Sequence, residues 1–172
     1  IGCTVSGTVN NGTLSVSELN EDMTIRELIS YVAEASGCSV KIDGSDHLCF
    51  MYYGDSGITL TSSEYKKLEV ADYVCAAIDN VTILNSVGAA IATAGSGTNT
   101  LYIEANPFLE EATNTEAALI LSLVEDFEYA PLTCDLFDAD DLEIGTIVTF
   151  GETPTLVMHL ESAEDGAVVS SV

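Results

Sequence analysis

Short apolar runs separated by turn residues recur along most of this chain, and only two stretches carry the spacing of an amphipathic helix. Runs of about four to eight apolar or β-branched residues between Gly, Pro, Asn and Asp clusters are typical of β-strands. Because helical and strand-like stretches are grouped rather than alternating, the pattern favours an α+β fold over a βαβ fold. We therefore predict mostly antiparallel, barrel- or sandwich-like sheets with two main helices near residues 24–36 and 107–127.

Boundary residues predict where both helices begin. Thr24 is followed three positions later by Glu27, which is the pattern of a capping box, and apolar residues then recur at helical spacing. Gly37 is the expected C-terminal stop. For the second helix, Asn106 is the expected cap and Pro107 the first helical residue. We expect the apolar faces of both helices to pack against a core.

The strand pattern predicts two hairpins near the N-terminus. Residues 3–9 and 13–16 flank an Asn-Asn-Gly turn, and residues 39–42 and 48–53 flank a second turn. A helical turn is expected over residues 62–67. Further strands are predicted over residues 58–61, 68–73, 78–86, 100–103, 132–136, 145–150, 155–160 and 167–172.

Composition argues for a folded chain and against several classes of function. The chain has 172 residues, of which 47% are hydrophobic, and 28 acids against 4 bases give a formal net charge of −24. Binding to nucleic acid or to an anionic membrane requires many basic side chains, and this chain has only Arg26, Lys41, Lys66 and Lys67. We therefore expect no sequence-specific binding of nucleic acid and no membrane partner.

The length is that of one structural unit, residues 1–172, or of two small intertwined domains. We see no internal repeat and no clear linker. The chain starts at Ile1 rather than at Met, so we expect it to be an excised fragment of a longer polypeptide. Five cysteines without a CxxC spacing predict reduced thiols in a protein made in a cytosol.

Residues that could support catalysis are few. His47 and His159 are the two histidines, but no nucleophile elbow accompanies either of them. The glycine-rich segment 95–97 is not followed by Lys and does not open a helix, so it fails the phosphate-loop and dinucleotide patterns. We therefore predict no catalytic residue and no cofactor-binding residue in this chain.

Two acidic turns have side chains of the type that binds calcium or magnesium. Their members are Asp43, Asp46 and His47 in the first turn and Asp138, Asp140, Asp141 and Glu143 in the second. Neither turn matches the twelve-residue calcium loop, which requires a central Gly and a distant Glu. We therefore interpret both as solvated acidic turns and predict no metal site.

Several short motifs, in order along the chain, resemble a region of the tail-tip hub proteins of siphophages and prophages. The motifs are residues 23–37, 43–44, 61–65, 68–73, 78–83, 106–109, 129–131 and 142–148. The resemblance covers about residues 22–160, whereas residues 1–20 have no counterpart and are expected to be a β extension. This sequence departs from the family at Thr146, where Asp is frequent, and in its scarcity of basic residues.

The resemblance implies a structural protein. In such hubs this region helps to form a ring, commonly trimeric, that closes the tail tube and connects it to the distal apparatus. Any peptidase or lytic activity belongs to a separate C-terminal module, so the resemblance implies no enzymatic activity and no cofactor here. It implies a homo-oligomer, other phage tail proteins as partners, and a place in the virion tail after assembly in the host bacterial cytoplasm. A ring lumen lined with carboxylates would repel DNA phosphates.

Two other functions stay open. A surface adhesin or carbohydrate-binding module is consistent with the β-rich pattern and with Tyr52, Tyr53, Tyr73 and Tyr102, although the chain has no Trp for stacking on sugars. A hydrolase that acts through carboxylates rests on nothing more specific than the number of acids. Salt adaptation is an alternative explanation of the acidity itself.

Overall fold

The chain divides into two compact units, each of which is made of two separate segments. Unit 1 comprises Ile1–Tyr52 and Ile78–Asp126, and unit 2 comprises Tyr53–Ala77 and Phe127–Val172. The computed structural model describes residues 4–6, 8–16, 19–43, 45–125, 127–139, 142–163 and 166–171. The predicted α+β class is confirmed, with two helices and open, largely antiparallel sheets in these described ranges. The expectation that residues 1–172 act as a single structural unit stays a prediction.

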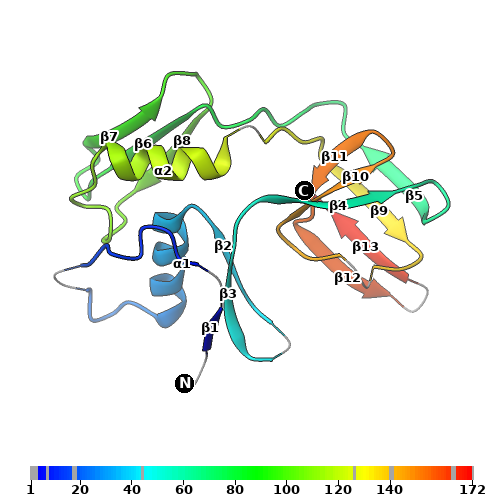
Figure 1. The fold of residues 1–172 in the computed structure, drawn as a ribbon, viewed down its shortest axis with the longest axis horizontal. Helices are drawn as coiled ribbons and strands as arrows, with labels where there is room; N and C mark the ends of the chain where they lie inside the picture. Colours follow the sequence, from blue (N-terminus) through cyan, green and yellow to red (C-terminus); the bar gives the residue numbers. More distant parts are fainter. Residues whose placement is uncertain are drawn as a thin grey trace. The chain divides into compact units, whose positions relative to one another are not determined.

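One part of unit 1, which we call the α2 layer, is a helix on a three-stranded sheet. The sheet has the order β7-β6-β8 and contains β6 (Asn80–Leu84), β7 (Ala90–Gly95) and β8 (Thr100–Glu104). Helix α2 (Asn114–Val124) packs on β6 and β7 (Figure 1). Its contact surface is fully apolar at the centre, where Val81, Ile83, Ile103, Ala117 and Ile120 are almost completely buried.

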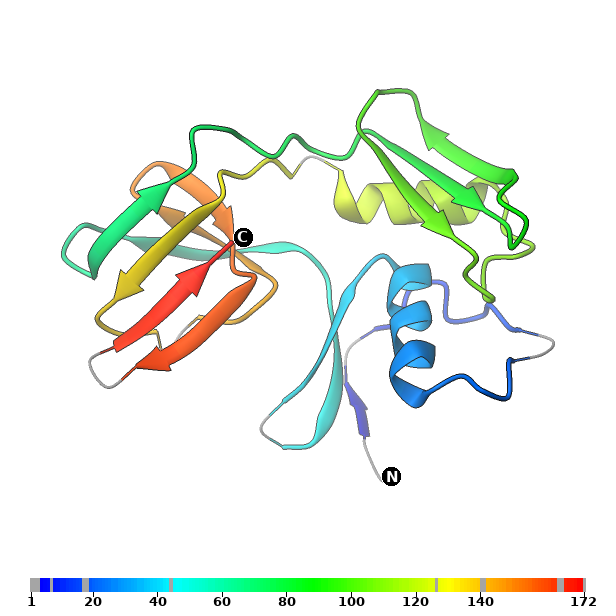
Figure 2. The same ribbon diagram turned by 180° about the vertical axis from the view of Figure 1, so that it is seen from behind.

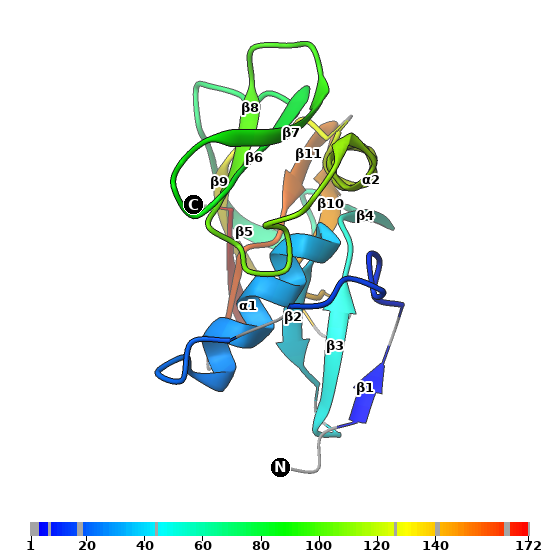
Figure 3. The same cartoon turned by 90° about the vertical axis from the view of Figure 1, so that its left-hand side faces the viewer.

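The other part of unit 1, the α1 layer, also combines a helix with a three-stranded sheet. Its strands are β1 (Thr4–Ser6), β2 (Ser39–Ile42) and β3 (His47–Met51), in the order β1-β3-β2. Helix α1 (Ile25–Ser36) lies beside β2 (Figure 3). β3 pairs parallel with β1 and antiparallel with β2, so the predicted second hairpin is confirmed. No residue of β2 or β3 is fully buried.

The predicted boundaries of α1 are confirmed. The Thr24 hydroxyl accepts a hydrogen bond from the Glu27 N–H at 3.2 Å, and the Glu27 carboxylate accepts one from the Thr24 N–H at 2.8 Å. Gly37 ends the helix with a φ of 66°, a conformation that costs a residue with a Cβ extra energy. Local capping and spacing signals were therefore enough to locate this helix.

The predicted start of the second helix is wrong, because α2 begins at Asn114 rather than at Pro107. The Asn106 side chain does accept a hydrogen bond from the Phe108 N–H, at 3.0 Å, but this contact stabilises an isolated turn. A second capping box, formed by Thr113 and Glu116, begins the helix instead. The helix ends at Val124, three residues short of the predicted end.

The predicted first hairpin is also wrong. Its first arm supplies β1, which pairs parallel with β3, and its second arm, residues 13–16, forms no strand. Long-range contacts hold the turn between them: the Asn10 N–H donates to the Tyr52 hydroxyl at 2.9 Å, and the Asn11 amide donates to the Ala35 carbonyl at 2.8 Å. These partners lie far along the chain, so local turn residues could not reveal them.

Unit 2 is made of two sheets that share one core. One sheet has the order β11-β10-β4 and contains β4 (Gly54–Leu60), β10 (Thr146–Phe150) and β11 (Thr153–Leu156). The other has the order β12-β13-β9-β5 and contains β5 (Tyr65–Val70), β9 (Leu132–Leu136), β12 (His159–Ala163) and β13 (Gly166–Ser170) (Figure 2). Alternate residues of β9 are buried, which is the pattern of a strand with one face on a core. Both sheets contribute to this core.

One helical-turn prediction and one strand prediction need correction in unit 2. Only residues 62–64 form a turn, and Lys66 and Lys67 lie in β5 rather than in a helical turn. The strand predicted over residues 155–160 is divided between β11 and β12 at Val157 and Met158. No helix in the described part of the chain is long and apolar enough to cross a membrane.

Candidate functional site

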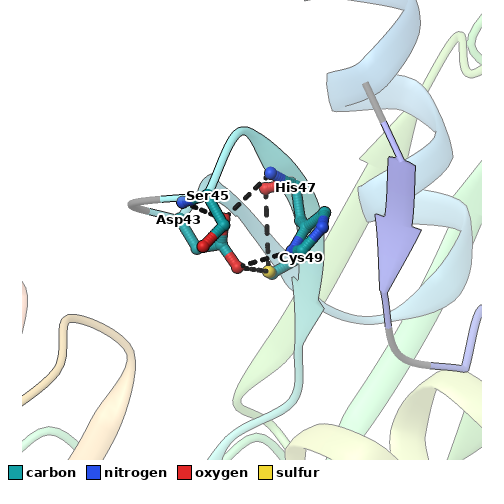
Figure 4. A network of polar contacts seen from close by, with 4 residues as sticks. All are labelled: Asp43, Ser45, His47 and Cys49. Atoms are coloured by element: carbon teal, nitrogen blue, oxygen red, sulfur yellow. Dashed lines mark hydrogen bonds and ion pairs between the residues drawn. The ribbon is translucent and has the colours of Figure 1, made fainter. Parts of the chain in front are cut away.

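The best-connected polar cluster among the predicted site residues lies in the hairpin between β2 and β3 (Figure 4). One carboxylate oxygen of Asp43 accepts hydrogen bonds from the N–H groups of Ser45 at 2.8 Å and His47 at 2.9 Å. The other lies 3.1 Å from His47 Nδ1 and 3.7 Å from the thiol of Cys49. Asp43 therefore satisfies the backbone of its own turn, as Asp commonly does in such loops.

These contacts explain the acidity of Asp43. Hydrogen bonds from the backbone N–H groups of His47 and Ser45 stabilise the carboxylate and lower the pKa of Asp43 to about 2. A lowered pKa stabilises the folded state above the ordinary pKa of the group, and this contribution is lost as the pH falls through the lowered value. The shift is thus explained by the geometry of the turn.

Asp43, His47 and Cys49 contain the residue types of a nucleophilic triad, but their geometry is different. In such a triad the nucleophile bonds to one imidazole nitrogen while the acid bonds to the other. Here the Cys49 thiol bonds to the carboxylate of Asp43 and to the carbonyl of His47. These two thiol contacts differ from those of a nucleophilic triad, in which the thiol bonds to an imidazole nitrogen.

The predicted acidic turns do not gather into a metal centre within the described ranges. No group of three or more His, Cys, Asp or Glu side chains there could hold a metal ion. Both oxygens of Asp43 are already bonded within the hairpin. Asp138 and Glu143 of the second turn lie within the described residues, whereas Asp140 and Asp141 lie outside them.

The second histidine lies on the surface of unit 2. His159 is in β12, and its Nε2 is 3.7 Å from a carboxylate oxygen of Glu161, with both side chains more than half exposed. An exposed pair of this kind contributes little to stability and does not enclose a substrate. His47 and His159 belong to different units, as the division of the chain requires.

Three stacked aromatic rings in unit 2 were not predicted. The ring of Phe127 lies 6.0 Å from that of Tyr53 and 5.3 Å from that of Tyr129, with small interplanar angles in both pairs. An isolated antiparallel bridge connects Tyr129 to Cys75. The stack therefore joins parts of unit 2 that are far apart in sequence, and only the alternation of Phe127 and Tyr129 could have indicated it.

Burial controls the acidity of several groups near the cores. Burial, with a smaller contribution from the neighbouring Cys75 thiol, raises the pKa of Tyr129 to about 12. Burial also raises the pKa of the Cys38 and Cys134 thiols to about 11. Thiols with raised pKa values are poor nucleophiles at neutral pH. No disulfide joins any two of the cysteines within the described residues.

The tyrosines of the carbohydrate-binding alternative are divided between the two units. The Tyr52 hydroxyl donates to the Thr8 carbonyl and accepts from the Asn10 N–H, so this side chain holds the N-terminal turn of unit 1. Tyr53 stacks on Phe127 in unit 2. Tyr73 in unit 2 and Tyr102 in β8 of unit 1 are more than half exposed.

A polar contact buried in unit 1 joins the two layers. The Asn106 side chain is 1% exposed and donates to the Tyr31 carbonyl at 2.9 Å and to the Glu34 carboxylate at 2.8 Å. Burial raises the pKa of Glu34, and the hydrogen bond from Asn106 partly opposes this increase. Asn106, predicted as a helix cap, instead attaches α1 to the segment that precedes α2.

Solved structures of other proteins share this arrangement. The chain is similar in structure to the 43 kDa tail protein of prophage MuSo2 from Shewanella oneidensis, with a TM-score of 0.50 and 17% identity over 90% of this chain and 55% of that protein. It is also similar to the tail protein from Neisseria meningitidis MC58, with a TM-score of 0.51 and 14% identity over 98% of this chain and 60% of that protein.

The comparison with solved structures concerns the fold of this chain and its length relative to the two tail proteins. No family model matches the sequence, and no curated protein matches it. The chain spans little more than half the length of the two tail proteins. At this level of identity the likeness concerns the fold alone, which this chain shares with the two tail proteins over 90% and 98% of its length.

Proposed function

We propose that this chain is a structural component of a phage or prophage tail. The observation that carries the proposal is the structural likeness to two tail proteins over 90% and 98% of the chain. The order of sequence motifs over about residues 22–160 supports the same class of protein, and this support does not depend on the three-dimensional structure. The chain's partners are then other tail proteins, and its location is the virion tail, following assembly in the host cytoplasm.

We further propose that the chain forms part of a ring at the tail-tip hub and that this ring closes the tail tube. A trimeric ring is the oligomeric state that we favour. The motif resemblance supports this position in the tail. The acidity is consistent with it, since a lumen lined with carboxylates repels the phosphates of passing DNA. Reversing the charge of several exposed acids is expected to slow genome ejection without preventing assembly. An unchanged rate of ejection would contradict the role of the lumen charge.

The proposed role does not involve catalysis by this segment. Each polar cluster described above is explained by a local structural role, since Asp43 bonds to its own hairpin and Asn106 joins α1 to the segment before α2. A carboxylate hydrolase would need a pair of acids facing a shared cleft. Neither polar cluster has that arrangement.

Detection of the chain in purified particles tests the proposal. The gene of the full protein is tagged in its phage or induced prophage, and particles are purified and labelled with gold-conjugated antibody. We expect the label at one end of the tail, and we expect deletion of the gene to yield particles without a complete tail. Complete, infectious particles that lack the protein would contradict the proposal.

A further inference from the structure

The α1 layer contains a groove that is apolar at its base. The groove has a volume of about 510 Å³ and is lined by residues of α1, β2 and β3. Ile29, Val40 and Leu48 are half-buried, and Ile25 and Ile42 at its margin are 61% and 62% exposed. Exposed apolar side chains around a groove are typical of a surface that binds a partner.

The charge of this groove is opposite to that of the chain as a whole. Arg26 and Lys41 line it, and they are two of the four basic side chains in a chain with a net charge of −24. No carboxylate from the described residues lines it. A groove with apolar walls and two cations favours an extended segment that carries both apolar and acidic side chains.

The same chain exposes a segment of this composition in unit 2. Residues 69–74 comprise the last two residues of β5, the outermost strand of its sheet, and the four residues that follow it, and they contain two acids, Glu69 and Asp72. Val70, Tyr73 and Val74 are 45%, 55% and 53% exposed. The Glu69 side chain is 65% exposed and pairs with Lys67 Nζ at 2.8 Å on the surface of its own strand. These five side chains could satisfy both the apolar base and the cationic margin of the groove.

We propose that the groove between α1 and the β2–β3 hairpin binds residues 69–74 of a second copy of this chain. Because the groove and the segment are different surfaces, the contact is head-to-tail, and contacts of this type close into a ring when the rotation between copies permits. The inference rests on the proposed tail ring and names the surfaces that hold it together. Other occupants of the groove are outcomes of the test.

Charge reversal on the two surfaces tests the proposal. Light scattering coupled to size-exclusion chromatography gives the oligomeric state and the dissociation constant of the full 172-residue chain. We expect an oligomer for the wild type and about tenfold or greater weakening for Arg26→Glu/Lys41→Glu and for Glu69→Lys/Asp72→Lys. Combining all four substitutions restores opposite charges across the contact, so it is expected to recover the oligomer. Circular dichroism verifies that each variant is folded.

Net charge is controlled within the same chain. Lys66→Glu changes the net charge as much as Arg26→Glu alone does, and Lys66 lies outside the groove, so we expect this variant to associate like the wild type and Arg26→Glu to associate more weakly. Lys67 is kept in the control because its Nζ pairs with Glu69 of the proposed contact at 2.8 Å. The Glu69→Lys/Asp72→Lys variant is less negative than the wild type, so general repulsion predicts stronger association where the proposal predicts weaker association.

Three results would overturn the proposal. They are a wild-type chain that stays monomeric, an Arg26→Glu variant that associates as well as the Lys66→Glu control, and a fourfold variant that fails to recover. These results concern the contact surface only. The tail assignment depends on the presence of the protein in particles, so the two proposals fail in different experiments.

Discussion

The two layers of unit 1 have the same plan and opposite degrees of burial. Each consists of one helix and a three-stranded sheet whose central strand has one parallel and one antiparallel neighbour. Each helix starts with a Thr-x-x-Glu capping box. In the α2 layer the central strand β6 has three buried residues, whereas the central strand β3 of the α1 layer has none.

This difference shows that local sequence signals determine where a helix forms, whereas they do not determine how deeply its layer is buried. Capping residues and periodicity define both helices, but they do not state what covers each helix. The α2 layer contains its own core, and the α1 layer leaves apolar side chains exposed beside a cationic groove. The layer that lacks a complete core is the one for which we propose a second copy as partner.

The largest predicted effect is the loss of a core side chain in the α2 layer. Ile83 is completely buried in β6, so Ile83→Ala should lower the free energy of unfolding by about 2–5 kcal/mol. Leu48→Ala in β3 removes a half-buried side chain and should cost less than about half as much. Urea denaturation of the monomeric chain measures both values. Equal losses would contradict the difference between the layers.

The next effect concerns the link between the layers. Asn106→Ala removes the hydrogen bonds that Asn106 donates to the Tyr31 carbonyl and the Glu34 carboxylate and the one that it accepts from the Phe108 N–H, at a cost of about 1–3 kcal/mol. Asn114→Ala is the matched control, because that exposed side chain accepts one hydrogen bond, from the Thr93 N–H. If the two variants unfold at the same urea concentration, Asn106 does not connect the layers energetically.

The two capping boxes should respond alike, in spite of the difference in burial. Thr24→Ala and Thr113→Ala should each cost about 1 kcal/mol at neutral pH. Hydrogen bonds from the Thr residues lower the pKa of Glu27 and of Glu116, so their stabilisation is present above the ordinary pKa and is lost as the pH falls through the lowered value. Thermal unfolding at pH 7 and about pH 3 should show both variants approaching the wild type in acid. A pH-independent difference would exclude the carboxylates from the effect.

The smallest predicted effect is that of the Asp43 turn in the α1 layer. Its carboxyl group should titrate at about 2 in the folded chain and near the ordinary value of 3.8 in the urea-unfolded chain, because only the folded hairpin supplies the backbone donors. Carbon-13 NMR titration of the carboxyl group measures both. Ser45→Pro removes one donating N–H and should raise the folded pKa. An unchanged value would assign the shift to other contacts.

Individual helices and strands show which parts of the fold could be predicted from the sequence. The α1 helix and the β2–β3 hairpin were predicted because their signals, Thr24 with Glu27 and the turn at Asp43, act between residues close along the chain. The start of α2 was misplaced because Asn106 stabilises a turn that is not part of the helix and also donates hydrogen bonds to α1. Its partners in α1, Tyr31 and Glu34, are distant in sequence. The N-terminal hairpin failed for the same reason, since β1 pairs with β3.

The candidate sites follow the same rule. The sequence correctly identified Asp43 and His47 as neighbours in one turn, because they are four residues apart. The aromatic stack of Tyr53, Phe127 and Tyr129 was missed, because it depends on how distant segments of unit 2 meet. The groove was missed because exposure of Ile25 and Ile42 depends on what packs against α1 and β2.

The α+β class, the position of α1, the negative charge and the scarcity of cations follow from composition and from contacts within a few residues, so they can be read from the amino-acid sequence. The pairing of the strands, the assembly of each unit from two segments and the position of two of the four cations beside one apolar groove are visible in the folded chain alone. The physical reason is that strand pairing and burial are set by non-local packing, where the energy of a residue depends on partners that are distant along the chain.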